Sequence, residues 1–183
     1  MIMMGKATKD LKNEHSAIIH VLKILDKIMA NHTKADLVKL QYYKELVDFL
    51  KIFADKCHHG KEENFLFEAL ISKGILNQGG PIGVMLEEHI EGREYIALMS
   101  RALEAANIAE FTPAAIGYRD LLRKHIDKEN NVLFVMADQL LDEKSQDELF
   151  EKFERHEESV IGHGVHEELH AKINKWATDF EVH

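Results

Sequence analysis

Residues 121–136 read LLRKHIDKENNVLFVM, and their spacing predicts how the chain folds. If it is helical, His125 and Glu129 lie four residues apart, one above the other on a single face. The same face carries apolar residues at steps of three or four: Leu121, Val132, Met136 and, just beyond, Leu140. The histidine and the glutamate therefore interrupt an apolar stripe that points into a core. A buried carboxylate is costly unless it is paired or bound to a cation, so the stretch predicts a polar site inside the protein.

The same pattern occurs a second time, in residues 57–67, which read CHHGKEENFLF. His58 and Glu62 stand four residues apart, and in both copies Leu-Phe follows the glutamate at the same distance. Two helices that each offer one imidazole and one carboxylate to a common core can hold a pair of metal ions. The neighbours His59 and Glu63 have the same spacing, but an α-helix turns by about 100° per residue. We therefore expect this alternative pair to point away from the core.

Breaks in the sequence divide the chain into helices. We expect helices over about 7–30, 36–73, 82–103 and 113–141, with Thr112 as the N-cap and Pro113 at the first helical position of the fourth. A fifth helical region, about 145–179, is interrupted at 162–164. The first four helices each bring one histidine to an apolar stripe: His15, His58, His89 and His125. The pattern predicts an all-α protein of one domain, residues 1–183, with a core over about 8–142 and an extension over about 145–180.

Composition narrows the class of protein. The chain has 183 residues, 45% hydrophobic and 30% charged, which is typical of a globular protein. A net charge of −9 disfavours nucleic acid as a partner, and no apolar run approaches the roughly 20 residues needed to span a membrane. The charged N-terminus lacks a signal-peptide pattern, so we expect a cytoplasmic protein. Twelve histidines are many for this length, and nitrogen and carboxylate ligands without sulfur suit iron or manganese, with zinc as an alternative.

Four segments carry a resemblance to a known family. The residues NEH around His15, HHGKEENFLF, GPIGVMLEEHIEGR around His89, and LLRKHIDKENNVLF resemble the hemerythrin-like (HHE cation-binding) family over about residues 8–142. The resemblance implies an up-down four-helix bundle, here with an additional C-terminal helix. It also implies a non-haem di-iron centre bridged by two carboxylates and an oxo or hydroxo group. Carried over to this chain, the terminal ligands are His15, His58, His89 and His125, and the bridges are Glu62 and Glu129.

Two positions depart from the oxygen-carrying members of that family. Arg93 stands where those members have a further histidine, and Glu129 follows His125 at four residues instead of five. Arginine does not ligate in its charged form, so the metal that His89 binds should keep an open position unless another helix fills it. We expect the reduced protein to oxidise quickly in air and to bind nitric oxide at iron. His163 or His166 from the C-terminal region are additional candidates for the missing ligand.

Three functions fit this site. The first is a di-iron protein that binds, senses or reduces oxygen, nitric oxide or peroxide. The second is repair of damaged iron centres by iron delivery, because the six-ligand pattern is similar to the iron-centre repair branch of the family. The third is a non-catalytic module that binds or stores iron.

The remaining reactive residues have simpler interpretations. Residues 166–170, HEELH, match a zinc-protease signature, but Ile173 and Trp176 stand where the extended motif needs glycine and histidine. We read this segment as an amphipathic helix. Cys57 is expected to be a buried packing residue, and Tyr118 to pack near the site. Surface or outer-layer positions are expected for the other histidines: His20, His32, His59 and His156.

Overall fold

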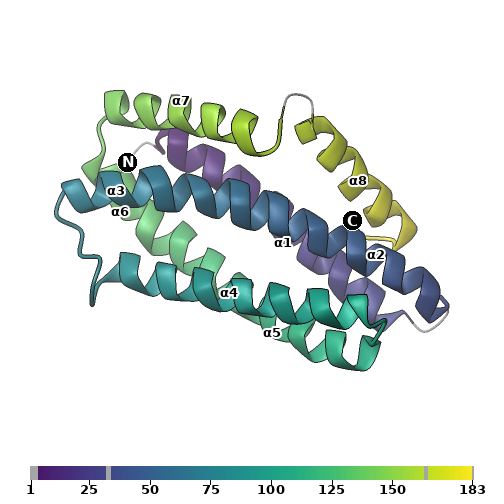
Figure 1. Cartoon of the computed structure of the whole chain (residues 1–183). Helices are drawn as coiled ribbons and strands as arrows, with labels where there is room; N and C mark the ends of the chain where they lie inside the picture. The colour runs from purple at the N-terminus through teal and green to yellow at the C-terminus, as the bar shows by residue number, and fades with distance from the viewer. Residues whose placement is uncertain (1–3, 32–33, 163–164, 183) are drawn as a thin grey trace.

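The computed structural model describes residues 4–31, 34–162 and 165–182, and its long segments are helical. The elements over residues 6–140 join into four helical rods, which run along one another (Figure 1). The first is α1 (Lys6–Ala30) and the third is α4 (Pro81–Glu104). The second rod joins α2 (Asp36–Phe49), η1 (Leu50–His59), η2 (Glu62–Leu66) and α3 (Phe67–Ser72), and the fourth joins α5 (Ile108–Lys128), η3 (Glu129–Leu133) and α6 (Phe134–Leu140). The expected all-α bundle is confirmed.

The core of the bundle consists of two apolar clusters with a polar layer between them. Along α1, Leu11 belongs to one cluster and Ile18 to the other. His15 lies between these two residues and is 1% exposed. Apolar packing on both sides therefore excludes water from the layer in which the histidine sits.

The fourth rod begins earlier than the sequence predicted. Asn107, not Thr112, is its N-cap, and its side chain accepts a hydrogen bond from the backbone N–H of Glu110. Pro113 lies inside α5, where it removes one backbone hydrogen bond near the start of the helix. Phe111 is fully buried in the core. Capping and burial of this first turn outweigh the local preference of proline for a helix start.

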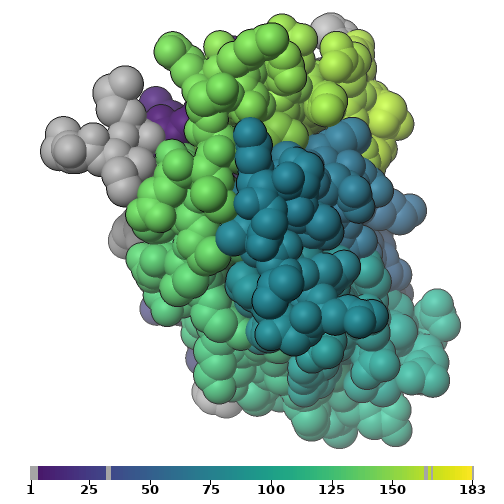
Figure 2. Space-filling model, turned by 90° about the vertical axis from the view of Figure 1, so that its left-hand side faces the viewer, coloured from purple at the N-terminus to yellow at the C-terminus, as the bar shows by residue number. Residues whose placement is uncertain are grey.

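The C-terminal extension forms two helices, α7 (Glu143–Val160) and α8 (Val165–Asp179), which pack on the bundle. Gln146 of α7 accepts hydrogen bonds from the backbone N–H groups of Ala7 and Thr8, which have no partner within α1. Trp176 of α8 is fully buried and donates its indole N–H to Glu45. Figure 2 shows α7, in light green, lying against the second rod. Among the described residues, no helix is long and apolar enough to cross a membrane.

Candidate metal centre

Two π-helical segments shape the second rod where it carries the histidines. The backbone is π-helical over Leu50–His59 and again over Glu62–Leu66. A π-helix has a wider turn than an α-helix, with i→i+5 hydrogen bonds, and is frequent at functional sites. In this wider turn the adjacent His58 and His59 both face the core, where they are 1% and 4% exposed. The expectation that His59 points away from the core is therefore wrong, because it assumed the rotation of a regular α-helix.

A third π-helical segment, Glu129–Leu133, alters the fourth rod in the same way. Glu129 is fully buried, as the sequence predicted. Beyond it the inward face moves by one residue, so that Leu133, Ala137 and Leu141 are buried. Val132 and Leu140 are exposed, and Met136 is half-buried. The predicted continuation of the apolar stripe is therefore wrong after Glu129, because the π-helical turn adds one residue to the period.

One group of side chains, which we call the His15 cluster, comprises His15, His58, Glu62 and Glu129. Their potential ligand atoms all lie within 4.8 Å of one another. Nε2 of His58 is 2.9 Å from Nε2 of His15 and 3.4 Å from Oε1 of Glu62. Nε2 of His15 is 3.2 Å from Oε2 of Glu129. The ring nitrogens and carboxylate oxygens converge on one small volume, an arrangement that suits a cation.

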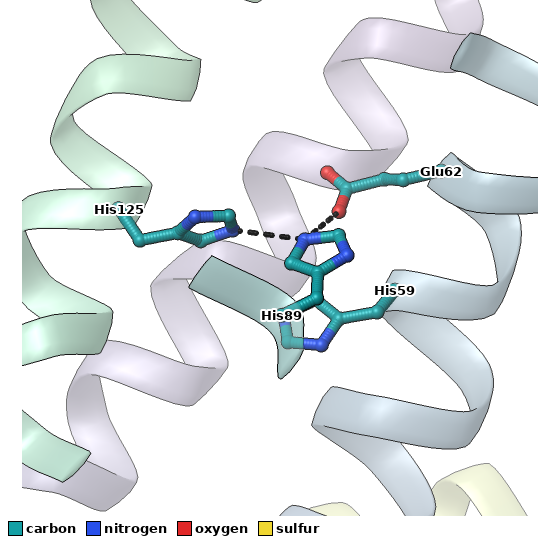
Figure 3. A group of neighbouring side chains, drawn as sticks. All are labelled: His59, Glu62, His89 and His125. Carbon is teal, nitrogen blue, oxygen red and sulfur yellow. Dashed lines mark hydrogen bonds and ion pairs between the residues drawn. The ribbon is translucent and has the colours of Figure 1, made fainter. Parts of the chain in front are cut away.

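A second group, which we call the His89 cluster, comprises His59, Glu62, His89 and His125 (Figure 3). Its potential ligand atoms also lie within 4.8 Å of one another. Nε2 of His89 is 3.2 Å from Nε2 of His125 and 3.4 Å from Oε2 of Glu62. The ring of His59 stacks on that of His89, with centroids 3.9 Å apart. Three histidines thus meet one carboxylate in this cluster.

The two buried carboxylates connect the clusters. Glu62 belongs to both, with Oε1 toward His58 and Oε2 toward His89. Oε2 of Glu129 is 3.2 Å from Nε2 of His15 in one cluster and 3.2 Å from Nε2 of His125 in the other. Both glutamates are fully buried, and their oxygens have no hydrogen-bond partner among the described residues. Because a buried carboxylate needs compensation, this donor set fits two metal ions with the carboxylates between them.

Four of the five histidines have their other ring nitrogen fixed by a neighbouring side chain. In each case Nδ1 is the donor. The pairs are His15 to Asn130 (2.8 Å), His58 to Glu14 (2.7 Å), His89 to Glu63 (2.7 Å) and His125 to Glu88 (2.9 Å). A proton on Nδ1 leaves the lone pair of Nε2 free for a metal, and such partners also fix the orientation of the ring. All four Nε2 atoms belong to the clusters described above.

Comparison with protein families identifies the chain. Residues 6–137 match the model of the hemerythrin HHE cation-binding domain. The chain belongs to this family. No curated protein and no solved structure matches it. The match covers the four rods of the bundle up to Ala137 of α6 and excludes α7 and α8.

Within this hemerythrin domain the structure brings together all six residues that the sequence selected: His15, His58, Glu62, His89, His125 and Glu129. Sequence reasoning missed His59. The available signal was the pair His58-His59 itself, together with the second four-residue spacing from His59 to Glu63. His59 differs from the other four because neither ring nitrogen has a hydrogen-bond partner in the described part of the chain, and its Nδ1 lies 3.5 Å from Asp55.

Burial and proximity set the charges of the two central carboxylates. Burial and repulsion by Glu129 raise the pKa of Glu62 well above its usual value. Burial also acts to raise the pKa of Glu129, but attraction to His125 outweighs it and holds the pKa well below its usual value. Burial lowers the pKa of His58 to about 4, whereas Glu129 and Glu88 overcome burial and raise that of His125 to about 9. These opposite pKa shifts favour the neutral form of Glu62 and the charged form of Glu129.

Arg93 does not leave the vacancy that the sequence suggested. Its side chain is 41% exposed and donates to Asp55 at 2.8 Å and to Glu63 at 2.7 Å. His59 supplies the third histidine on this side from the second rod. The π-helical turn thus brings in a histidine from another helix, which is the exception that the sequence prediction allowed for the open position next to His89. His163 and the side chain of His166 lie outside the described residues.

The other candidate residues have packing or surface positions. Cys57 is fully buried, and burial raises the pKa of its thiol. Tyr118 packs in the apolar core, and its hydroxyl has no hydrogen-bond partner among the described residues. His20 is half-buried, and His156 donates to the backbone carbonyl of Lys56. His32 lies outside the described residues.

Proposed function

We propose that the protein is a non-haem di-iron protein that binds, senses or reduces oxygen, nitric oxide or peroxide. The His15 cluster would hold one iron and the His89 cluster the other, and Glu62 and Glu129, which face histidines of both clusters, would serve both ions. The observation that carries the proposal is a pair of fully buried carboxylates, each of which faces histidines of both clusters and has no hydrogen-bond partner among the residues that the structure describes. Family membership supports cation binding by these residues.

Iron is the metal that best fits both the donors and the chemistry. The donors are imidazole nitrogens and carboxylate oxygens, which suit iron or manganese and allow zinc. Cys57 belongs to a different group, with Glu14 and Glu157, so no thiolate enters either cluster. Iron supplies the electrons with which a small ligand is bound or reduced.

The two clusters differ in the number of histidines, which indicates where a small ligand binds. The His89 cluster has three histidines and the His15 cluster has two. We therefore place the open position on the side of His15 and His58. The ring of His15 stacks on Phe134 at a centroid distance of 5.3 Å, and Phe134 is fully buried. These side chains exclude water and orient the donors, while the Nδ1 partners of the histidines hold the rings in place.

Nitric oxide tests this proposal, because it forms coloured complexes with ferrous iron. Protein purified without air and loaded with ferrous iron should develop a visible absorption band when nitric oxide is added. His58→Ala should lose most of this band, whereas His59→Ala should keep it, because only His58 belongs to the cluster with the open position. If His59→Ala loses the band and His58→Ala keeps it, the open position lies in the other cluster. If iron-loaded protein responds to neither nitric oxide nor oxygen, the protein binds iron without acting on a small ligand, and the proposal is wrong.

A further inference from the structure

Helix α7 reaches the metal centre although it lies outside the residues that match the hemerythrin domain. The match ends at residue 137, and α7 begins at Glu143. In Figures 1 and 2 this helix lies along the second rod. Phe153 of α7 is fully buried, and His156 donates from Nε2 to the carbonyl of Lys56 at 3.0 Å. The helix is therefore fixed beside the turn that carries His58.

Gly60 permits this close approach. A Cβ atom at Gly60 would lie 2.5 Å from Nε2 of His156, which is too short for any real contact. The ring of His156 also meets Phe65 edge-on, with centroids 5.6 Å apart. The helix thus lies directly on the π-helical part of the second rod, one and two residues away from His59 and His58.

Lys61 links α7 to α1 in the interior of the protein. Its side chain is only 1% exposed, and its ammonium group donates to Asp10 at 3.1 Å, Glu14 at 2.7 Å and Glu157 at 2.8 Å. An ammonium has three N–H donors, so each is used once. Asp10 and Glu14 belong to α1, and Glu157 belongs to α7. Burial acts to lower the pKa of Lys61, but its carboxylate neighbours outweigh burial and raise the pKa, so the group is charged.

Glu14 connects Lys61 to His58 through its two carboxylate oxygens. Oε1 of Glu14 accepts from Lys61, and Oε2 accepts from Nδ1 of His58 at 2.7 Å. Burial acts to raise the pKa of Glu14, but His58 and Lys61 lower it to about 2, so the carboxylate is charged. A chain of three short contacts therefore runs from Glu157 through Lys61 and Glu14 to His58.

We propose that Glu157 is a positioning residue of the metal centre, which acts through Lys61 and Glu14 on the orientation and donor strength of His58. The inference rests on the proposed di-iron site and concerns only its His15 cluster. A carboxylate on Nδ1–H orients a ligating imidazole and makes it a stronger donor. Glu157 holds Lys61 in the position from which Lys61 holds Glu14. The C-terminal helix thereby adjusts the metal position that carries the open coordination site.

The carboxylate partners of His89 and His125 pair with cations near the surface. These cations are Arg93 and Lys128, which are 41% and 40% exposed. Solvent screens those ion pairs, and both cations belong to the bundle itself. Among the described residues, Lys61 and Glu14 form a buried pair, and their contact with Glu157 comes from outside the residues that match the hemerythrin domain.

The test compares Glu157→Gln with Glu158→Gln, a matched change at an exposed residue of the same helix. Each protein is titrated with Co²⁺ alone, without air and against a chelator of known affinity. Loss of a direct partner of a ligating histidine costs about 10- to 100-fold in metal affinity. Because Glu157 acts two contacts further away, we expect Glu157→Gln to weaken one of the two ions by about 3- to 10-fold. The second ion and the Glu158→Gln protein should match the parent.

Paramagnetic proton NMR of the Co²⁺ protein identifies the affected histidine. Each ligating histidine with a proton on Nδ1 gives a shifted, exchangeable resonance, and that of His58 is assigned by its loss in Glu14→Ala. Glu157→Gln should move this resonance and leave the other histidine resonances in place. Unchanged affinities and resonances in Glu157→Gln would overturn the inference, as would equal weakening of both ions with all resonances shifted, which indicates general loss of structure. If the parent protein binds no Co²⁺ in either cluster, the di-iron proposal itself fails, and this inference fails with it.

Discussion

The two clusters of the candidate centre share their carboxylates but differ in their surroundings. Behind the His15 cluster, the cation that holds the partner of His58 is Lys61, which is 1% exposed and covered by α7. Behind the His89 cluster, the corresponding cations are Arg93 and Lys128, which are about two-fifths exposed. One side of the centre is thus built into the protein interior, and the other is supported from the surface. The degree of burial should determine how much each of these cations contributes to the free energy of unfolding.

The largest effect is expected from Lys61→Met. This change leaves Asp10, Glu14 and Glu157 close together without their shared cation. Breaking a buried ion pair by removing one partner costs about 3–5 kcal/mol. We expect the free energy of unfolding, measured with urea, to fall by that amount, and Lys61→Arg to restore most of it. A loss below about 1 kcal/mol would mean that Lys61 behaves like a surface cation, and the contrast between the two sides would disappear.

A smaller effect of opposite sign is expected from Glu62→Met in protein stripped of metal. Glu62 is fully buried, and neither oxygen has a hydrogen-bond partner among the described residues. Removing this group should raise the free energy of unfolding of the metal-free protein by about 1–3 kcal/mol. The same variant should bind neither metal, because Glu62 belongs to both clusters. Glu68→Met, at an exposed position of the same rod, is the control and should change neither quantity.

The smallest effects are expected from Arg93→Met and Lys128→Met. Both side chains pair with carboxylates near the surface of the His89 side. Exposed ion pairs contribute about 0–1 kcal/mol, so each variant should unfold within about 1 kcal/mol of the parent. Arg93→Met should be the larger of the two, since Arg93 contacts both Asp55 and Glu63. A loss from either variant as large as that from Lys61→Met would contradict the account of a buried and an exposed side.

Much of the bundle could be predicted from periodicity. The 3.6-residue repeat, together with helix starts and the few glycines and prolines, located four long helices and the extension. The start of α5 was misplaced because Thr112-Pro113 is a strong local signal for a helix start. The structure instead begins the helix at Asn107 and buries Phe111, and these contacts depend on the rest of the fold.

Sequence spacing predicted the inward-facing residues of the site correctly only where the backbone is a regular α-helix. His15 and His89 lie on α-helices, and spacing alone placed them on the inner faces. His59 and the apolar residues after Glu129 were misassigned because the backbone there is π-helical. The hydrophobic period that located the helices assumes 3.6 residues per turn, so it does not detect a π-helical turn. The π-helical turn that the sequence did not predict also brings His59, the third histidine, into the His89 cluster.

The outer contacts could not be predicted at all. Glu14, Glu63 and Glu88 are charged residues in a charge-rich sequence, and nothing in their spacing separates them from solvent-exposed glutamates. Only the three-dimensional arrangement places each of them within hydrogen-bond distance of a histidine. These contacts orient the rings, so the residues that support the ligands are known only from the structure, whereas candidate ligands could be predicted from the sequence.

The number of iron ions per chain, measured in protein purified without air and supplied with iron, tests whether the two clusters form a two-metal centre. Two clusters with shared carboxylates should hold two iron ions per chain, and Glu62→Ala should lose both, because one glutamate serves both positions. His89→Ala should lose one and retain the other. A reproducible content of two iron ions in the parent protein, with these changes in the variants, is the predicted result. One iron per chain, or none, in iron-replete protein would contradict the account.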